Sequence, residues 1–471
     1  MTRHKKSIVR DSDNNAYELK KRIGEGGQGI VFTTSEKNIL VKLLNTKDKE
    51  KIKQFEKQLN WILAQNLDGL PLALPQKAIT KPYKGYVMEL MDELHPLQSV
   101  IEESFIGLSE EQSIEKYLTT GGLKRRLKLL FNIAKTLAEL HGRGYAYGDL
   151  SPANIFVSED VNHHQAWFID CDNLCFQERS ALGTVFTPGY GSPEVVKFGA
   201  NINCQTDAWS FAVIAFELLT HQHPFKGLVV EDGDPDIVEQ QAHEAELPWI
   251  YSTEDDSNES VGGLDLSIVA NSRIIALFEL CFTVGIKNPS KRPSLSQWRD
   301  ALQEAVDQMA KCSSVLEHHF YYSLQAESQE CPFCDTVTQH SQYTIFQHIL
   351  TEFNLENSSE TTYDLEHFRV LNKGEEISFS SCPYNTELWH LEEPSLTLAF
   401  SEDGALELLP NLSARYLVAR GQNTLTFDSR KKVPLKNRDA DQPYQIATWY
   451  ENDEKDDEQM NIIQSYRWQF V

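Results

Sequence analysis

Three polar residues at fixed spacing constrain this chain more than any other feature of its sequence. Asp149 is followed five residues later by Asn154, and Asp170 ends an apolar run another sixteen residues on. An aspartate can orient an attacking hydroxyl and accept its proton, while an asparagine oxygen or a second carboxylate can bind Mg²⁺. As separate pieces they also fit a helix cap or a turn. Together they indicate phosphoryl transfer, and a fold that brings the two loops to one place.

A glycine-rich turn lies upstream of these residues. Residues 24–31 fit the pattern G-x-G-x-x-G-x-V, in which Gly24, Gly26 and Gly29 let backbone amides approach phosphate oxygens without a side-chain clash. Lys42 follows on a predicted strand, from which it can reach the α- and β-phosphates. A plain hairpin turn and a solvated strand lysine are the alternatives, so these residues are not decisive alone.

The next segment, residues 47–66, is predicted to be a helix because its apolar residues recur at helical spacing: Ile52, Phe55, Leu59, Ile62 and Leu63. Glu56 lies on this helix and is the candidate ion-pair partner of Lys42. Glu50 is a nearby alternative. For both glutamates, the competing interpretation is an exposed charge on a lysine-rich helix face.

In this order and spacing, the segments resemble eukaryotic-like (Hanks-type) Ser/Thr protein kinases over about residues 17–305. Asp149 and Asn154 match the family's H-R-D-x-x-x-x-N loop, and Asp170 matches the acid of its D-F-G motif. The resemblance implies an α+β bilobal fold, with a small β-rich lobe and a helical lobe, and ATP and Mg²⁺ as cofactors. Asn154 and Asp170 would hold the metal. The residues implied around adenine are Val31, Met88, Glu89, Met91 and Phe156.

Three downstream motifs separate protein kinases from small-molecule kinases, which normally lack them. Residues 187–194 resemble the T-P-G-Y-x-A-P-E segment that positions a protein substrate, and residues 207–210 resemble the D-x-W-S start of a buried helix. Arg292 resembles the arginine of a late R-P motif, which pairs with the family's equivalent of Glu194. The resemblance therefore implies transfer to Ser or Thr of protein substrates.

The catalytic loop departs from the family pattern. Gly148 replaces the arginine that commonly receives an activation-loop phosphate, and Ser151 replaces the lysine that helps to neutralise the γ-phosphate. The D-F-G motif reads Asp170-Cys171-Asp172, in which Asp172 is either a second metal ligand or a turn acid. These changes favour one alternative, a pseudokinase that binds nucleotide as a signalling scaffold. Similar loops occur in bacterial kinases encoded near von Willebrand-type proteins and metal-dependent phosphatases, which implies partners of those two kinds.

We expect five segments along the chain: a flexible tail at 1–16, the N-lobe and hinge at 17–91, the C-lobe at 92–305, a helical Cys/His linker at 306–375 and a β-rich accessory domain at 376–471. The last segment alternates apolar and polar residues between turn residues, which is typical of strands. We interpret it as a recognition or regulatory module.

The linker contains the one C-x-x-C pair that we interpret as a metal site. Cys331 and Cys334 are followed by His340 and His348, at spacings that suit a Cys₂His₂ zinc site. Cys382 is an alternative ligand. Two free thiols at a helix start are an equally good interpretation of the pair.

The charge of the chain argues against two classes of partner. Its 69 acidic and 44 basic residues give a formal net charge of −25. An acidic surface repels nucleic acid and anionic membrane, so we expect neither as a partner. The most apolar stretch, residues 211–219, is too short to span a bilayer. We therefore expect a cytoplasmic protein that binds ATP and protein substrates.

Overall fold

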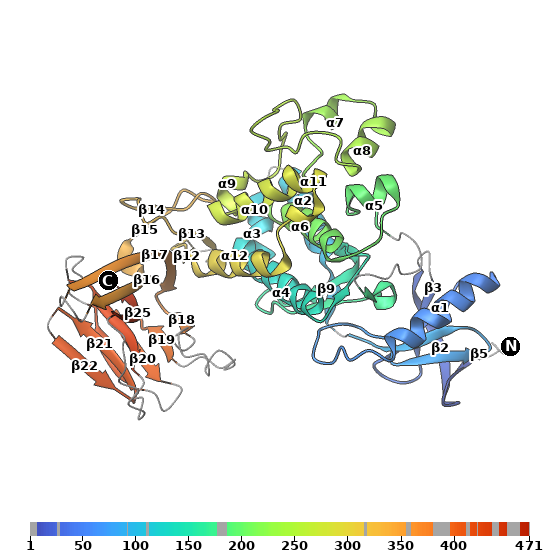
Figure 1. Ribbon diagram of the computed structural model, residues 1–471, viewed down its shortest axis with the longest axis horizontal. Coiled ribbons are helices and arrows are strands. Elements are labelled where there is room, and N and C mark those ends of the chain that lie inside the picture. Colours follow the sequence, from blue (N-terminus) through green and yellow to red (C-terminus); the bar gives the residue numbers. More distant parts are fainter. Residues whose placement is uncertain are drawn as a thin grey trace. The chain divides into compact units, whose positions relative to one another are not determined.

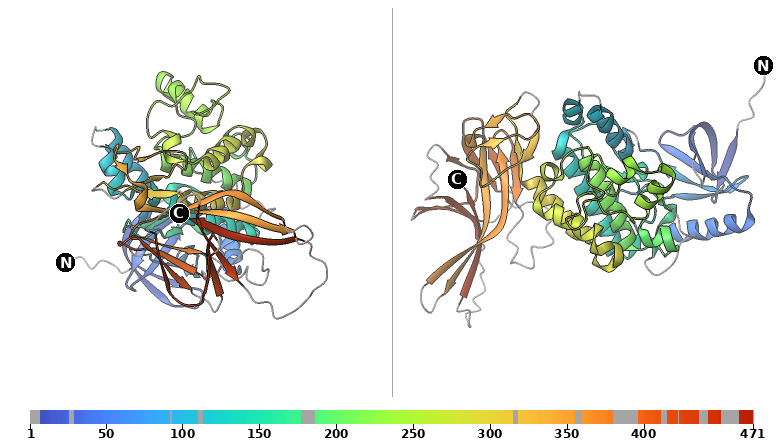
Figure 2. Two further views of the ribbon diagram at one scale, coloured as in Figure 1. Left: turned by 90° about the vertical axis from the view of Figure 1, so that its left-hand side faces the viewer. Right: turned by 90° about the horizontal axis from the view of Figure 1, so that it is seen from above.

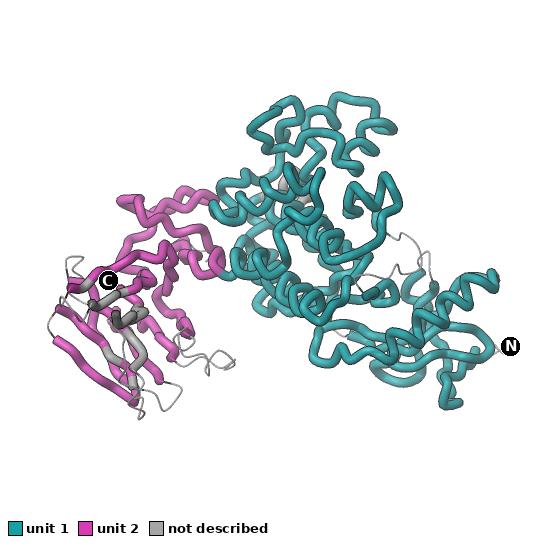
Figure 3. Tube along the Cα trace, in the orientation of Figure 1, with its two compact units in different colours: residues 1–303 teal, residues 304–471 magenta. Residues whose placement is uncertain are grey.

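The computed structural model describes residues 7–25, 29–91, 93–109, 113–176, 186–314, 318–354, 359–379, 396–410, 415–421, 423–435, 442–449 and 462–470. The chain divides into two compact units, residues 1–303 and 304–471 (Figure 3). Lys42, Asp149 and Asp170 lie in the first unit, and Cys331 and Cys334 lie in the second.

The N-lobe (residues 7–91) is built on a closed barrel of antiparallel strands in the order β1-β2-β3-β4-β6-β5 (Figure 1). The strands are β1 (Ile8–Asp11), β2 (Ala16–Glu25), β3 (Gly29–Thr34), β4 (Ile39–Leu44), β5 (Lys77–Lys81) and β6 (Gly85–Glu89). Strand β1 corrects our expectation of a tail at 1–16. It pairs with both β2 and β5, and Val9 is fully buried in the barrel core, so this strand closes the barrel.

Helix α1 (Lys49–Ile62) packs against the barrel through one apolar stripe. Asp48 caps its start by accepting hydrogen bonds from the backbone N–H groups of Glu50 and Lys51. Leu59 is buried against side chains of β4 and β6, and Phe55 packs on the same cluster. The stripe fixes which face of the helix is turned to the rest of the lobe.

The C-lobe (residues 93–303) is mainly helical (Figures 1 and 2). Its helices are α2 (Leu97–Ser109), α3 (Ser113–Thr119), α4 (Gly122–Gly142), α5 (Pro193–Phe198), α6 (Cys204–Thr220), α7 (Leu228–Asp232), α8 (Pro235–His243), α9 (Leu266–Val269), α10 (Ser272–Phe282), α11 (Val284–Lys287) and the start of α12 (Leu295–Asp307). Helix α6 is buried on almost every side, so it forms the centre of the lobe.

Short strands in the C-lobe hold the loops that carry the polar residues. These strands are β7 (Leu94–Pro96), β8 (Tyr145–Ala146), β9 (Ile155–Ser158), β10 (Ala166–Phe168) and β11 (Cys175–Phe176). The loop with Asp149 and Asn154 runs from β8 to β9, and Asp170 follows β10. Strand β9 pairs with β10, and β8 pairs with β11, so the two loops are fixed side by side.

The second unit contains two antiparallel sheets that share one hydrophobic core. The larger sheet has the order β17-β16-β25-β24-β21-β22, with β16 (Tyr343–Asn354), β17 (Ser359–Asn372), β21 (Arg415–Arg420), β22 (Asn423–Phe427), β24 (Tyr444–Trp449) and β25 (Ile462–Phe470). The smaller has the order β18-β19-β20-β23, with β18 (Glu376–Phe379), β19 (Leu396–Phe400), β20 (Ala405–Pro410) and β23 (Lys431–Pro434).

Our expectation of a helical linker at 306–375 was wrong beyond the end of α12. Two short hairpins follow that helix: β12 (Met309–Lys311) with β13 (His319–Tyr321), and β14 (Gln329–Glu330) with β15 (Val337–Thr338). Residues 343–354 and 359–372 then form two strands of the larger sheet, because aromatic and β-branched side chains there suit a pleated surface. No helix within the described ranges has both the length and the apolar character needed to cross a bilayer.

Candidate active site

A cleft with a volume of about 500 Å³ lies between the barrel and the C-lobe. Its walls bring together most of the residues that the sequence singled out. Those lining it from the N-lobe are Gly24, Gly29, Val31, Lys42, Met88, Glu89 and Met91. Those lining it from the C-lobe are Asp149, Asn154, Phe156 and Asp170. Gly26 lies outside the described residues.

Helix α6 holds the loop between β8 and β9 through hydrogen bonds to the side chain of Asp207. Asp207, in the first turn of α6, accepts hydrogen bonds from the backbone N–H of Tyr147 at 2.7 Å and of Gly148 at 3.0 Å. The ring of His141 lies 3.0 Å from the same carboxylate. Tyr147 donates its O–H to the carbonyl of Ile169, which ties this loop to the one that carries Asp170.

Asp149 is fixed by a hydrogen bond at its side chain and another at its backbone. The Thr187 hydroxyl donates to its carboxylate at 2.9 Å, and the Asn154 amide donates to its backbone carbonyl at 2.9 Å. Burial raises the pKa of the Asp149 carboxyl above its ordinary value, with Asp170 adding to the shift, although hydrogen bonds oppose it. A carboxylate with a raised pKa accepts a proton more readily, as a general base must.

Lys42 forms a buried cluster with two carboxylates. Its Nζ lies 3.1 Å from Asp170 Oδ1 and 2.8 Å from Asp172 Oδ2, and its side chain is 7% exposed. Burial alone would lower the pKa of Lys42, but the two carboxylates outweigh it and the pKa is raised. The lysine is therefore charged and held in one position at the back of the cleft.

Asp172 is the centre of this cluster, a role that sequence reasoning missed. The Tyr86 hydroxyl, from β6, donates to its Oδ1 at 2.6 Å. Gln58, from α1, donates to the backbone carbonyls of Asp172 at 3.1 Å and Leu174 at 2.6 Å. These contacts tie the segment after Asp170 to both the barrel and α1. Asp170 itself has a left-handed backbone with φ of 52°, which a residue other than glycine adopts at a cost.

Glu56 does not contact Lys42, which corrects our prediction of its partner. Its carboxylate pairs with Lys84 Nζ at 2.6 Å, and its side chain is 43% exposed. The side chains of α1 that pack on the barrel include Phe55 and Leu59. Gln58 is the residue of α1 that reaches the segment after Asp170, and residue 56 lies about 160° from it around the helix.

Gly148 and Ser151 are the two positions at which this loop departs from the family pattern, and the structure shows what surrounds each of them. Gly148 has φ of 97°, and a Cβ there would lie 2.9 Å from the carbonyl oxygen of Asn173. A residue with a side chain would therefore be strained at this position. Ser151 is buried, and its hydroxyl has no hydrogen-bond partner among the described residues. It brings no charge to the cleft.

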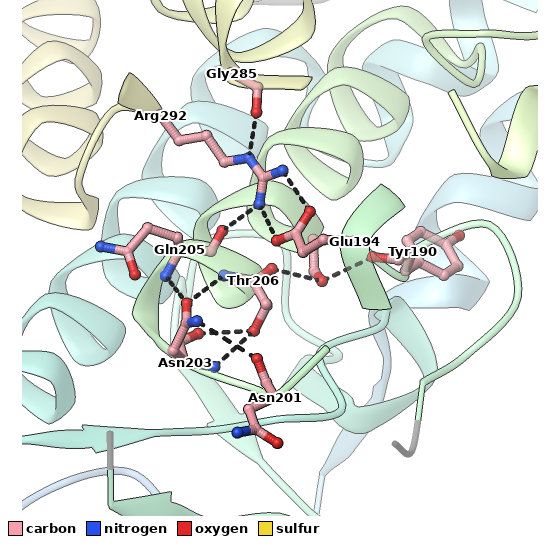
Figure 4. Close-up of polar contacts among 9 residues, drawn as sticks. Tyr190, Glu194, Asn201, Asn203, Gln205, Thr206, Gly285 and Arg292 are labelled. Carbon is pink, nitrogen blue, oxygen red and sulfur yellow. Dashed lines mark hydrogen bonds and ion pairs between the residues drawn. The ribbon is translucent and has the colours of Figure 1, made fainter. Parts of the chain in front are cut away.

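The segment that follows Thr187 is anchored by a bidentate ion pair (Figure 4). Both terminal nitrogens of Arg292 lie 2.7 Å from the oxygens of Glu194 in α5, and its Nε donates to the carbonyl of Gly285 at 2.9 Å. The guanidinium also stacks 4.9 Å from the ring centre of Trp209. Burial opposes ionisation of Glu194, but the guanidinium more than offsets it and the carboxyl pKa is lowered.

The structure contradicts part of the expected zinc set in the second unit. Cys331 and Cys334 lie close together, but His340 contacts the Tyr322 hydroxyl and the carbonyl of Glu327. His348 lies on β16 and stacks on Trp468. Both histidines therefore have contacts of their own away from Cys331 and Cys334. Cys382 lies outside the described residues.

Comparison with known proteins points to one family. The model of the protein kinase domain matches residues 17–305. The serine/threonine-protein kinase pkn2 of Myxococcus xanthus is 31% identical over 206 residues, which cover 42% of this chain and 22% of that protein. Ribosomal protein S6 kinase alpha-3 of Homo sapiens is 27% identical over 239 residues, covering 48% and 30%. Myosin light chain kinase A of Dictyostelium discoideum is 27% identical over 232 residues, covering 48% and 72%. The chain thus spans less than a third of the length of the first two relatives.

Proposed function

The chain belongs to the protein kinase family, and on that premise we propose that it transfers the γ-phosphate of ATP to Ser and Thr hydroxyls of protein substrates, itself included. One observation carries the proposal: Lys42, Asp149 and Asp170 line a single cleft, with Asn154 beside them. The choice of reaction is supported by the similarity to the serine/threonine-protein kinase pkn2, at 31% identity, and to ribosomal protein S6 kinase alpha-3, at 27%.

The residues of the cleft fit ATP with Mg²⁺. Val31, Met88 and Phe156 offer apolar surface for a base, whereas Lys42 is the one cation among the described lining residues and suits phosphate. Asp170 and the side-chain oxygen of Asn154 would hold Mg²⁺, which prefers oxygen ligands. When bound, the metal neutralises charge on the phosphates.

Asp149 would act as the general base. Thr187 already donates to one of its oxygens, so the hydrogen bond fixes the carboxylate while leaving the second oxygen for the attacking hydroxyl. The raised pKa of this carboxyl, caused mainly by burial, favours acceptance of the proton. Positioning and charge stabilisation account for most of the catalysis in this reaction class.

Asp172 would position Lys42 in place of a helix glutamate. Its carboxylate reaches Lys42 Nζ at 2.8 Å, and the Tyr86 hydroxyl holds its other oxygen. In this arrangement the partner of the lysine belongs to the same loop as the metal ligand Asp170. Since Ser151 supplies no charge, neutralisation of the γ-phosphate would rest on Lys42 and the metal.

The substrate side of the proposal rests on residues 187–194. Thr187 contacts the catalytic carboxylate, and Glu194 is fixed by Arg292, so the segment is held beside Asp149 at one end and to the core of the C-lobe at the other. A protein substrate would align along it. A recognition or regulatory role for the second unit belongs to the proposal because that unit is rich in strands and carries none of the described residues of the cleft. A cognate phosphatase or a von Willebrand-type partner belongs to it through the resemblance of the catalytic loop alone.

The test is transfer of label from γ-labelled ATP with Mg²⁺, to the chain itself and to a generic protein substrate. Asp149→Ala and Asp170→Ala serve as the inactive variants, and Glu56→Gln serves as a control that changes an exposed carboxylate. We expect label on Ser or Thr of the wild type and the control only. Nucleotide binding without transfer by any of the four proteins would instead identify a pseudokinase.

A further inference from the structure

Four side chains in the second unit meet at one point that the proposed kinase chemistry does not use. Cys312, His318, Cys331 and Cys334 bring their ligand atoms within 4.8 Å of one another. Cys312, His318 and Cys331 are buried, with 2%, 5% and 0% of their surface exposed. Sulfur and imidazole nitrogen are the donors that Zn²⁺ takes in closed structural sites. We propose that these four residues bind one structural Zn²⁺.

The distances suit a tetrahedral ion. With Zn–S bonds of about 2.3 Å and a Zn–N bond of about 2.0 Å, neighbouring sulfurs lie about 3.8 Å apart and a sulfur lies about 3.5 Å from the nitrogen. Cys312 Sγ lies 3.7 Å from Cys334 Sγ, and Cys334 Sγ lies 3.5 Å from His318 Nε2. The 2.9 Å between His318 Nε2 and Cys331 Sγ is shorter than such an edge, so these two atoms would separate by about 0.6 Å around the ion.

The backbone explains why the four residues converge. Cys312 directly follows β12 and His318 directly precedes β13, and the backbone N–H of Cys312 donates to the carbonyl of His318 at 2.7 Å. Cys331 and Cys334 lie on the turn between β14 and β15, where Asp335 has φ of 55°. Each hairpin therefore supplies two ligands from the loop that connects its strands.

Outer contacts orient the ligands. The ring of His318 presents Nε2 to the sulfurs, while its Nδ1 lies 3.4 Å from the Ser314 hydroxyl. The backbone N–H of Ser314 donates to Cys312 Sγ at 3.4 Å, and the Thr336 hydroxyl lies 3.2 Å from Cys334 Sγ. Such contacts fix the tautomer of the histidine and support negative charge on the sulfurs.

The ion would join two elements that are weak by themselves. Each hairpin is a two-stranded sheet of two or three residues a strand, and neither contributes a residue to the shared core of the two large sheets. Isolated two-stranded hairpins are marginal in water. With four protein ligands the site has no open position for a substrate, so its role is structural and not catalytic.

A disulfide is the main rival chemistry. The 3.7 Å between Cys312 Sγ and Cys334 Sγ is much longer than a bond of about 2.05 Å, and all seven cysteines that the structure describes are free thiols. A disulfide in the purified protein would consume two ligands and prevent zinc binding.

The experiment measures metal content in the full chain, purified without chelators and then dialysed. We expect about one zinc per chain for the wild type, and a loss of most of it in Cys331→Ser and in His318→Ala. His340→Ala, His348→Ala and Cys204→Ser are matched controls outside the cluster and should keep the metal. Exchange with Co²⁺ should give intense visible bands from a tetrahedral thiolate site in the wild type.

The cobalt spectrum and the reactivity of the thiols keep the proposal testable where a cysteine variant fails to fold. In the wild type, three thiols should become reactive toward an alkylating agent only after a chelator removes the metal. Three results would each overturn the assignment. These are wild-type protein with no stoichiometric zinc, a Cys312–Cys334 disulfide found by mass spectrometry, and full zinc retention in folded Cys331→Ser. Neither the metal content nor the thiol count depends on kinase activity.

Discussion

Glu217 is an ionisable residue on the most buried helix of the C-lobe. It accepts a hydrogen bond from the Tyr190 hydroxyl at 2.7 Å, which links α6 to the segment that follows Thr187. Burial raises the pKa of this carboxyl to about 7 from an ordinary 4.5, although Tyr190 and Lys226 oppose the shift. A carboxyl with a raised pKa binds its proton more tightly in the folded chain than in the unfolded chain. The free energy of unfolding therefore falls as the pH rises from about 4.5 to about 7.

We therefore expect the free energy of unfolding of the first unit to fall between pH 4.5 and 7, by about 3 kcal/mol more in the wild type than in Glu217→Gln. Urea unfolding at several pH values measures this difference. Glu231→Gln, a change of an exposed glutamate on α7, is the control and should follow the wild type. Identical pH dependence in the wild type and Glu217→Gln would contradict the burial of this charge.

At the same scale, the residues that the sequence located correctly are those whose position is fixed by a nearby strand. Lys42, Asp149, Asn154 and Asp170 line the cleft because each stands at a set distance from a strand end. The prediction that Glu56 pairs with Lys42 was wrong, because it depended on which face of α1 carries residue 56. The apolar pattern of that helix does not separate the two positions, because Gln58, which reaches the segment after Asp170, lies no closer to the centre of the apolar stripe than Glu56 does.

Asp172 and the cluster of three cysteines and His318 show what the sequence leaves open. Asp172 could be interpreted only as a metal ligand or a turn acid, because its contact with Lys42 joins residues that are 130 positions apart. Cys312 and His318 carried no spacing signal of their own. Their convergence with Cys331 and Cys334 depends on the pairing of two short hairpins.

At the scale of elements, helices were easier to predict than strands. Helix α4 (Gly122–Gly142) can be recognised in the sequence, since its apolar residues repeat over many turns. Strand β1 has only four residues, and nothing in so short a segment separates it from a loose tail. Its burial depends on β2 and β5, which supply the partners that a lone strand lacks.

The prediction of a helical linker at 306–375 was wrong for a related reason. Strands β16 and β17 are long, but their register shifts between Gln347 and Ile349, which interrupts the simple alternation by which a strand is recognised. Both strands belong to the larger sheet of the second unit, so the β-rich region begins well before residue 376.

At the scale of the whole molecule, the described residues form hydrophobic clusters in each of the two units. The core of the second unit consists of residues between Phe346 and Phe470, and the barrel core consists of residues between Val9 and Val87. The cleft lies wholly within the first unit. A ligand that binds the cleft should therefore stabilise one unit and leave the other unchanged.

Calorimetry should show two unfolding transitions, of which ADP with Mg²⁺ raises only one. At a ligand concentration of about 100 times Kd, the shift should be about 4 °C for a unit of this size. Asp170→Ala is the control and should lose most of the shift. A single transition that moves as a whole would show that the two units unfold together.

The central claim is that the cleft is assembled for phosphoryl transfer, with Lys42 positioned by Asp172 and not by the glutamate of α1. The most direct measurement is kcat/KM for ATP in the transfer reaction of the wild type, Asp172→Asn and Glu56→Gln, with thermal unfolding of each protein measured alongside. We predict a loss of about tenfold to a hundredfold for Asp172→Asn, because a buried partner of Lys42 is removed, and a change of less than about twofold for Glu56→Gln. The unfolding midpoint of Glu56→Gln should equal that of the wild type. Transfer that survives Asp172→Asn but is lost in a stably folded Glu56→Gln would contradict the account, as would a wild-type chain that binds ATP and transfers nothing.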